Sequence, residues 1–197
     1  MINIHEIEVH RLHPTQITVG MIEVQDKRAI LANLKNHALR DFLQSHPIPA
    51  VEGPEEKLYI TDHHHLGRAV LDQNLTTGFF LIEADLSQLS LEVFWPEMDK
   101  HKWVHPYDEN GTLKSFVDIP RHLTHLIDDP YRSIAGYVRN AGGYQKTDAA
   151  FSEFLWADFF RSRITLTEVH SNFESAVQEG VVLAHGVDAK TLPGYFV

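Results

Sequence analysis

Apolar and polar residues in the first half of the chain follow two alternating patterns. Some short segments alternate apolar with polar residues or are apolar throughout, which is typical of strands: residues 4–12, 48–51, 57–60 and 79–84. Between them, apolar residues recur at helical spacing in residues 24–34, 37–45 and 61–73. This order predicts an α+β fold in which a small mixed β-sheet carries helices.

The pattern changes after Asp85, where helical spacing becomes dominant. The predicted helices are residues 89–102, interrupted at Pro96, and then 118–127, 130–140, 149–163 and 167–183. An Asn-Gly pair at 110–111 predicts a tight turn between short extended pieces. We therefore expect a sheet-containing domain over residues 1–86, followed by a mainly helical C-terminal region, residues 87–197, packed on it.

Composition narrows the classes of function. With 27 acidic and 17 basic residues, the formal net charge is −10, so strong non-specific binding to nucleic acids is not expected. Cysteine is absent, which excludes disulfides and thiol catalysis. No apolar run approaches the ~18 residues of a membrane span, and the N-terminus lacks a signal-peptide core. We expect a soluble, cytoplasmic protein without membrane partners.

The strongest candidate for chemistry is a run of histidines, His63, His64 and His65, at the predicted junction of strand 57–60 with the next helix. Thr61 or Asp62 is a suitable N-cap, which would put the imidazoles in the first helical turn. Helix starts carry unpaired N–H groups and the positive end of the helix dipole, and they favour a phosphate.

Helical geometry predicts how these side chains are distributed. At ~100° per residue, His63 lies at the edge of the apolar stripe, while His64, His65 and Arg68 share the opposite flank. Arg68 follows His64 by one turn and would add a fixed positive charge. Two other interpretations stay open: a solvated helix start, and a metal site in which Asp62 and His64 or His65 need further ligands from elsewhere.

A resemblance to a known family gives this run more meaning. Members of the ParB/sulfiredoxin superfamily carry Gly-x-His/Arg-Arg-x-x-Ala or Asp-Gly-His-His-Arg at a strand-to-helix junction. Asp62, His64, His65 and Ala69 match, whereas His63 replaces the glycine and Leu66 the arginine. The opening also resembles this family, in a strand, a Pro-Thr-Gln turn at 14–16 and a helix with a lysine. The chain is most similar to the branch named Putative ParB-like nuclease, over roughly residues 5–85.

The resemblance implies a nucleotide- or phosphate-binding site and a reaction. His64, His65 and Asp62 would be catalytic, with a histidine as general acid or base in phosphodiester hydrolysis or phosphoryl transfer. The phosphate or nucleotide would be bound by further residues: His63, Arg68, Gln16, Thr18, Gly20, Glu23 and Lys27. ATP or CTP with Mg²⁺ is the expected cofactor set. The enzyme would be a nuclease, a phosphohydrolase or a small-molecule kinase; a non-catalytic nucleotide-binding switch or partner-binding module is the alternative. Sulfiredoxin chemistry is excluded, because His64 stands where that activity needs a cysteine.

Overall fold

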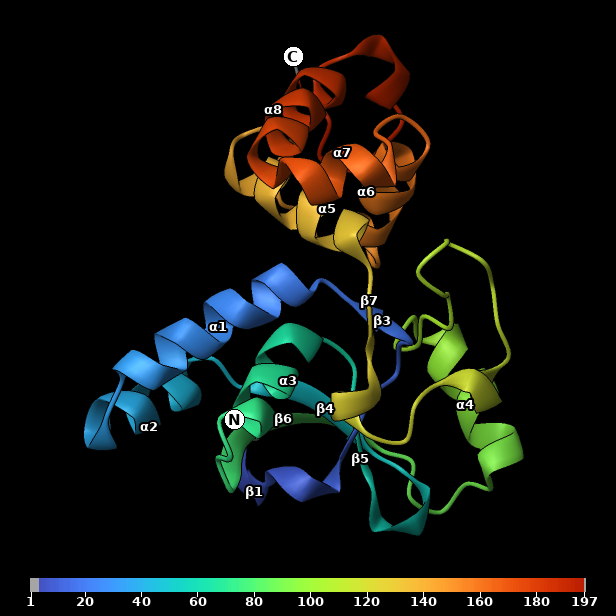
Figure 1. Cartoon of the computed structure of the whole chain (residues 1–197). Helices are drawn as coiled ribbons and strands as arrows, with labels where there is room; N and C mark the ends of the chain where they lie inside the picture. Colours follow the sequence, from blue (N-terminus) through green and yellow to red (C-terminus); the bar gives the residue numbers. More distant parts are fainter. Residues whose placement is uncertain (1–3, 197) are drawn as a thin grey trace. The chain divides into compact units, whose positions relative to one another are not determined.

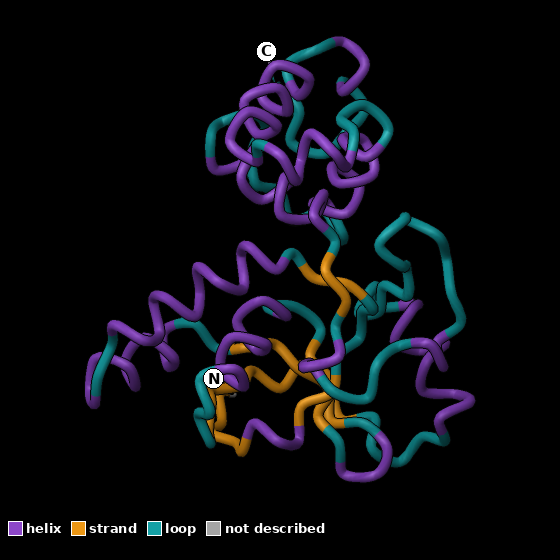
Figure 2. The backbone as a smooth tube through the Cα atoms, viewed as in Figure 1, coloured by secondary structure: helices purple, strands orange, loops and turns teal. Residues whose placement is uncertain are grey.

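The computed structural model describes residues 4–196, and these divide into two compact units. The first, here called the sheet unit, holds the residues up to 19 together with 24–108 and 112–127. The second, the helical unit, holds residues 20–23, 109–111 and 128–197. Figure 1 shows the course of the chain through both units, and Figure 2 shows that most of the strand structure lies in the sheet unit.

The sheet unit is built on a five-stranded mixed sheet with the strand order β1-β6-β4-β5-β2. The strands are β1 (Ile4–Glu8), β2 (Leu12–His13), β4 (Ile48–Glu52), β5 (Leu58–Ile60) and β6 (Thr77–Asp85). β1 and β5 pair antiparallel with β6 and β4, whereas β4 with β6 and β2 with β5 are parallel. The predicted α+β fold with a small mixed sheet is confirmed.

Helices and a second short sheet complete the first two thirds of the chain. The helices are α1 (Met21–Asn33), α2 (Asn36–Ser45), α3 (His64–Asp72) and α4 (Leu91–Lys100), and β3 (Thr18–Val19) and β7 (Ile127–Asp128) form a two-stranded sheet. α4 continues through Pro96, so the predicted interruption is wrong. Phe94 and Met98 on either side of the proline are fully buried, and this packing holds the helix together.

The prediction of a helix over residues 118–127 is also wrong. Two 3-10 turns, Phe116–Asp118 and Leu123–His125, occupy this stretch and its approach. Between them Ile119 is extended, with φ −64° and ψ 126°. The reason is steric, because the residue before a proline is pushed out of the helical region, and Pro120 follows Ile119 directly.

Four helices form the bundle of the helical unit (Figure 1): α5 (Pro130–Asn140), α6 (Ser152–Arg161), α7 (Leu166–Ser171) and α8 (Phe173–Ala184). The predicted helix 130–140 is confirmed, whereas 167–183 is two helices. They separate at Asn172, whose φ of −153° is not helical. The Asn172 side chain accepts a hydrogen bond from Ser175 N at 3.1 Å, so it caps α8 and favours the break.

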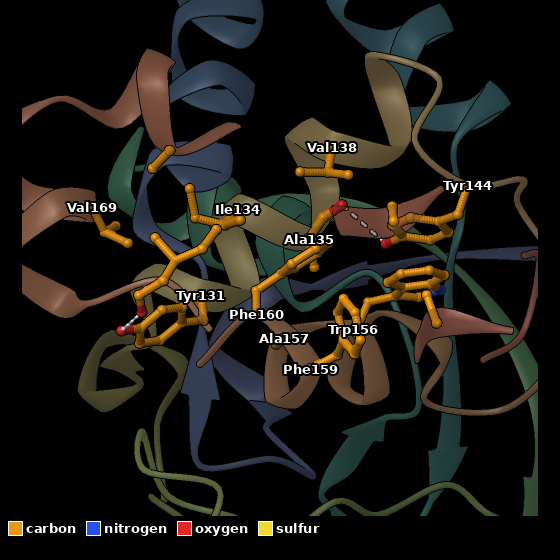
Figure 3. Close-up of a cluster of buried hydrophobic side chains, with 14 residues drawn as sticks. Tyr131, Ile134, Ala135, Val138, Tyr144, Trp156, Ala157, Phe159, Phe160 and Val169 are labelled. Atoms are coloured by element: carbon orange, nitrogen blue, oxygen red, sulfur yellow. Dashed lines mark hydrogen bonds between the residues drawn. The ribbon is translucent and has the colours of Figure 1, made fainter. Parts of the chain in front are cut away.

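The core of the helical unit is rich in aromatic side chains whose polar atoms are satisfied (Figure 3). Trp156 stacks on Tyr144 with ring centroids 4.2 Å apart. The Tyr144 hydroxyl donates to Ala135 O at 2.9 Å, and the Tyr131 hydroxyl donates to Ile164 O at 2.8 Å. Because these hydroxyls keep partners, the unit buries large rings without the cost of an unpaired polar group.

Candidate functional site

The histidine run enters α3 through one residue with left-handed backbone geometry. His63 is the N-cap, with φ 60° and ψ 29°, and it makes no side-chain cap bond. Asp62 Oδ1 accepts the backbone N–H of His63 at 2.7 Å. The predicted caps, Thr61 and Asp62, therefore lie one or two residues too early. Only His64 and His65 belong to the first helical turn, and the side chains of Asp62 and His63 are exposed.

His64 connects α3 to the segment before β3. It is only 4% exposed, so it does not lie on a polar flank as the helical spacing predicted. Its Nε2 accepts the backbone N–H of Thr15 at 3.1 Å, and the Thr15 hydroxyl donates to Ile60 O at 2.7 Å. An Nε2 that accepts a hydrogen bond carries no proton, so the imidazole is neutral with its proton on Nδ1.

Arg68 is directed to groups of its own unit. Its Nε donates to Asp72 Oδ1 at 2.9 Å, one turn further along α3, and Nη1 donates to Leu123 O at 3.2 Å. Asp72 also lies 3.9 Å from the guanidinium of Arg28. These contacts tie α3 to the 3-10 turn at Leu123–His125. A role for Arg68 at a phosphate stays a prediction.

The remaining candidates fall into two groups. Gln16 and Thr18 are buried beside Thr15, and Gln16 Nε2 donates to Thr18 O at 2.7 Å, which shapes this turn. Lys27 is half-buried on α1, and His65 is half-buried on α3. Gly20 and Glu23 belong to the helical unit instead.

In the helical unit, Glu23 takes part in a buried charge network. Its Oε1 lies 3.3 Å from Nη1 of Arg132, whose other terminal nitrogen lies 3.9 Å from Glu153. Asp129 caps α5 by accepting from Tyr131 N and pairs with Arg161 at 2.6 Å. Burial raises the pKa of Asp129, although Arg161 acts in the opposite direction. The Glu23 carboxylate thus pairs with a buried guanidinium, of which Nε has no hydrogen-bond partner among the described residues. A role for Glu23 at a phosphate stays a prediction.

With the link between the two motif segments established, comparison with known proteins identifies the family. The family model described as Putative ParB-like nuclease matches residues 5–162. The chain belongs to this family. The resemblance found in the sequence is thereby confirmed. The matched range extends well beyond the two motif segments.

Two solved structures are similar to the chain. Protein Atu1540 from Agrobacterium tumefaciens is 38% identical, with a TM-score of 0.92 over 100% of this chain and 97% of that one. ParB from Caulobacter crescentus, C-terminally truncated and complexed with CTP-gamma-S, is 10% identical with a TM-score of 0.33 over 94% of each chain. A likeness as low as the second carries no information about ligands. No curated protein matches the chain significantly.

The sequence did not predict a group of neighbouring aromatic rings close to the two motif segments of the chain. We call it the ring row: Tyr59, His13, His122 and His125. Successive ring centroids lie 5.5, 5.9 and 5.8 Å apart. Burial lowers the pKa of His13 to about 4, and the nearby Lys57 and His122 add to this shift. His13 precedes the Pro-Thr-Gln turn, but nothing in the pattern connects it with the two later histidines.

Two absences complete the description. Across residues 4–196 no group of three or more imidazoles and carboxylates has an arrangement that could hold a metal ion, so the Asp62–His64 pair lacks a third ligand there. No helix in that same range has the length and apolar content needed to cross a bilayer.

Proposed function

We propose that this member of the ParB-like nuclease family binds the phosphate of a nucleotide or nucleic acid at the start of α3 and cleaves or transfers it. One observation carries the proposal: the two motif segments, far apart in sequence, are joined by the hydrogen bond from Thr15 N to His64 Nε2. A fold that uses a buried histidine to hold its two motifs together keeps the helix start in a fixed position.

The chemistry follows from the neighbours of that bond. The N-terminal N–H groups of α3 and its dipole favour a dianionic phosphate. His65, half-buried in the first turn, and His63, exposed at the cap, are the imidazoles proposed as proton carriers. Asp62, which already holds the His63 N–H, is proposed to orient the cap or a Mg²⁺ ion carried by the nucleotide. His64 acts as the positioning residue, since its Nε2 is used by Thr15.

Charge favours a small or short ligand over a long duplex. The chain carries a formal charge of −10, and non-specific affinity for nucleic acids grows with the number of phosphates neutralised by lysine and arginine. A free nucleotide such as ATP or CTP, or a short strand, requires only local complementarity at one helix start. The proposed reaction class is therefore phosphodiester hydrolysis or phosphoryl transfer on such a ligand.

A second candidate, a nucleotide-binding module without turnover, is favoured by two contacts. The Nε2 of His64 and the guanidinium of Arg68 are both bonded within the fold, to Thr15 and to Asp72 with Leu123. Proton transfer by His64 Nε2, the role that the resemblance implied, would require its bond to Thr15 to break first. Phosphate binding by the N–H groups at the start of α3 requires no such change, and product formation separates the two candidates.

The test is a thermal-shift series with ATP, CTP, a short single-stranded oligonucleotide and ribose 5-phosphate, each with and without Mg²⁺. A ligand at tenfold excess over its Kd should stabilise the protein by about 1.4 kcal/mol. The His65→Gln variant should lose the thermal stabilisation by the ligand if His65 contributes to binding. It should lose product formation if His65 carries a proton in the reaction. His37→Gln, an exposed histidine on α2, is the matched control. If no ligand stabilises the wild type, the proposal is rejected.

A further inference from the structure

One residue of β6 interrupts the register between β4 and β6. Ala50 of β4 pairs with Ile82 of β6. The next residue of β4, Val51, pairs with Ala84, so Glu83 is an extra residue on β6. Such β-bulges redirect side chains, occur often next to active sites and are rare between parallel strands. Because β4 and β6 are parallel, the bulge at Glu83 is unusual, and its consequence is a changed direction for this side chain.

The Glu83 carboxylate contacts the chain directly after β5. Its Oε2 accepts the Thr61 hydroxyl at 2.5 Å, a length typical of a hydrogen bond to an ionised carboxylate. The backbone N–H of Thr61 donates to Pro49 O of β4 at 3.0 Å, so Thr61 is held by two strands at once. Asp62 and His63 follow immediately, and the bulge therefore tethers the chain just ahead of α3.

The Thr61 side chain is directed away from α3. A Cβ on Gly67 of α3 would lie 3.2 Å from Ile60 Cδ1 and 3.8 Å from Ile48 Cδ1, so α3 packs on the face of the sheet that carries these two side chains. Successive residues of an extended chain point to opposite faces, and Thr61 directly follows Ile60. Glu83 therefore acts on α3 through the backbone of Thr61, which is the property of a positioning residue.

Between Thr61 and α3 the backbone is strained. His63 has φ 60° and ψ 29°, a left-handed conformation that is unfavourable for a residue with a Cβ and persists only where the surroundings hold it in place. On one side of His63, Thr61 is held by Glu83. On the other side, His64 is held by the N–H of Thr15. The strained residue is thus restrained at both ends.

We propose that Glu83 is a positioning residue of the candidate site: its bond to Thr61 keeps His63 in the left-handed conformation and so fixes the start of α3. As a statement about a ligand site, this inference rests on the function proposed above. Without the bond, His63 relaxes toward a more favourable backbone conformation, and the N–H groups of the first helical turn lose their common direction. A phosphate that uses those N–H groups then binds less tightly.

The experiment removes each end of the Glu83–Thr61 bond. Amide hydrogen exchange of residues 62–66 is measured together with the dissociation constants of inorganic phosphate and of ATP and CTP with Mg²⁺. Thr61→Val and Glu83→Ala should speed exchange in this segment and weaken binding, each by about 3- to 30-fold. Thr61→Ser and Glu83→Gln keep a donor and an acceptor and should stay close to the wild type.

Two further variants test whether the effect passes through His63. Adding His63→Gly to Thr61→Val should remove most of the increase in exchange at residues 64–66, because glycine adopts the left-handed conformation without strain. A general loss of stability would not be rescued in this way. Thr76→Val, which changes an exposed threonine just before β6, is the matched control and should leave exchange and binding unchanged.

The outcomes separate the two proposals. Unchanged exchange in Thr61→Val and Glu83→Ala refutes the role of Glu83, and so does faster exchange spread evenly over the sheet unit. Faster exchange confined to residues 62–66 with unchanged affinities also refutes it, because the bond then does not position the site. If none of the three probes binds the wild type, the function proposed above fails, while the exchange data still decide whether Glu83 fixes the start of α3.

Discussion

Acidification is expected to destabilise the fold through His13 of the ring row. Burial, with help from Lys57 and His122, lowers the pKa of this imidazole from 6.5 to about 4. In the unfolded chain the ring regains its ordinary pKa, so between these two values the unfolded state binds a proton that the folded state does not. Linkage then requires the stability contributed by the neutral ring to be complete above about pH 6.5 and to be lost as the pH falls to about 4.

The size of the effect on stability follows from the difference between the pKa values of His13 in the unfolded and the folded chain. For a fully shielded ring this difference would correspond to about 3 kcal/mol, and solvent screening of a partly exposed ring reduces it to about 1–2 kcal/mol. The perturbation is His13→Asn, which removes the titrating ring and keeps a hydrogen-bonding side chain for the Arg121 backbone. The decrease in the free energy of unfolding that His13→Asn causes should therefore be about 1–2 kcal/mol smaller at pH 4.5 than at pH 7.5.

The assay is urea denaturation of the wild type and the variant at several pH values between 4.5 and 7.5, analysed as differences so that carboxylates common to both proteins cancel. His10→Asn is the matched control, because that side chain is 74% exposed. Parallel curves for the wild type and His13→Asn would refute the reasoning. They would mean that the His13 ring titrates alike in the folded and unfolded chains.

Further predictions concern the helical unit, and each is checked by urea denaturation. A Cβ on Gly180 would lie 2.5 Å from Val138 Cγ2, so Gly180→Ala should cost about 1–3 kcal/mol; an unchanged midpoint would contradict the close packing. Trp156→Phe removes the N–H that donates to Pro193 O at 2.8 Å and should cost about 1–3 kcal/mol, whereas a loss near zero would show that water replaces this bond. Thr165→Ala breaks the capping box of α7 and should cost about 1 kcal/mol, with Thr165→Ser retaining most of the stability.

Much of the fold was predictable, because in most of the chain the spacing of apolar residues matches the helix or strand that forms there. The apolar run that gives β4 and the helical spacing that gives α5 are both local signals, and both elements form close to the predicted positions. The failures have physical causes of another kind. The segment near Pro120 is apolar enough for a helix, but the restriction on the residue before a proline prevents one.

The candidate site was predictable in outline only. The resemblance assigned the histidine helix start and the Pro-Thr-Gln turn to one family pattern, and in the structure Thr15 contacts His64. The inward direction of the His64 ring is not indicated by any periodicity, and neither is the left-handed conformation of His63, which few residues other than glycine adopt. The ring row depends on strand register and on a distant turn, so it becomes visible only in three dimensions.

The buried network around Arg132 has a consequence for any exchange of segments between relatives. Arg132 is 8% exposed, and one of its carboxylate partners, Glu23, comes from a four-residue piece near the other end of the chain. A fragment beginning at residue 128 would inherit the guanidinium without that counterion, a defect that typically costs about 3–5 kcal/mol. A transplant of the bundle from this chain should therefore carry residues 20–23 with it.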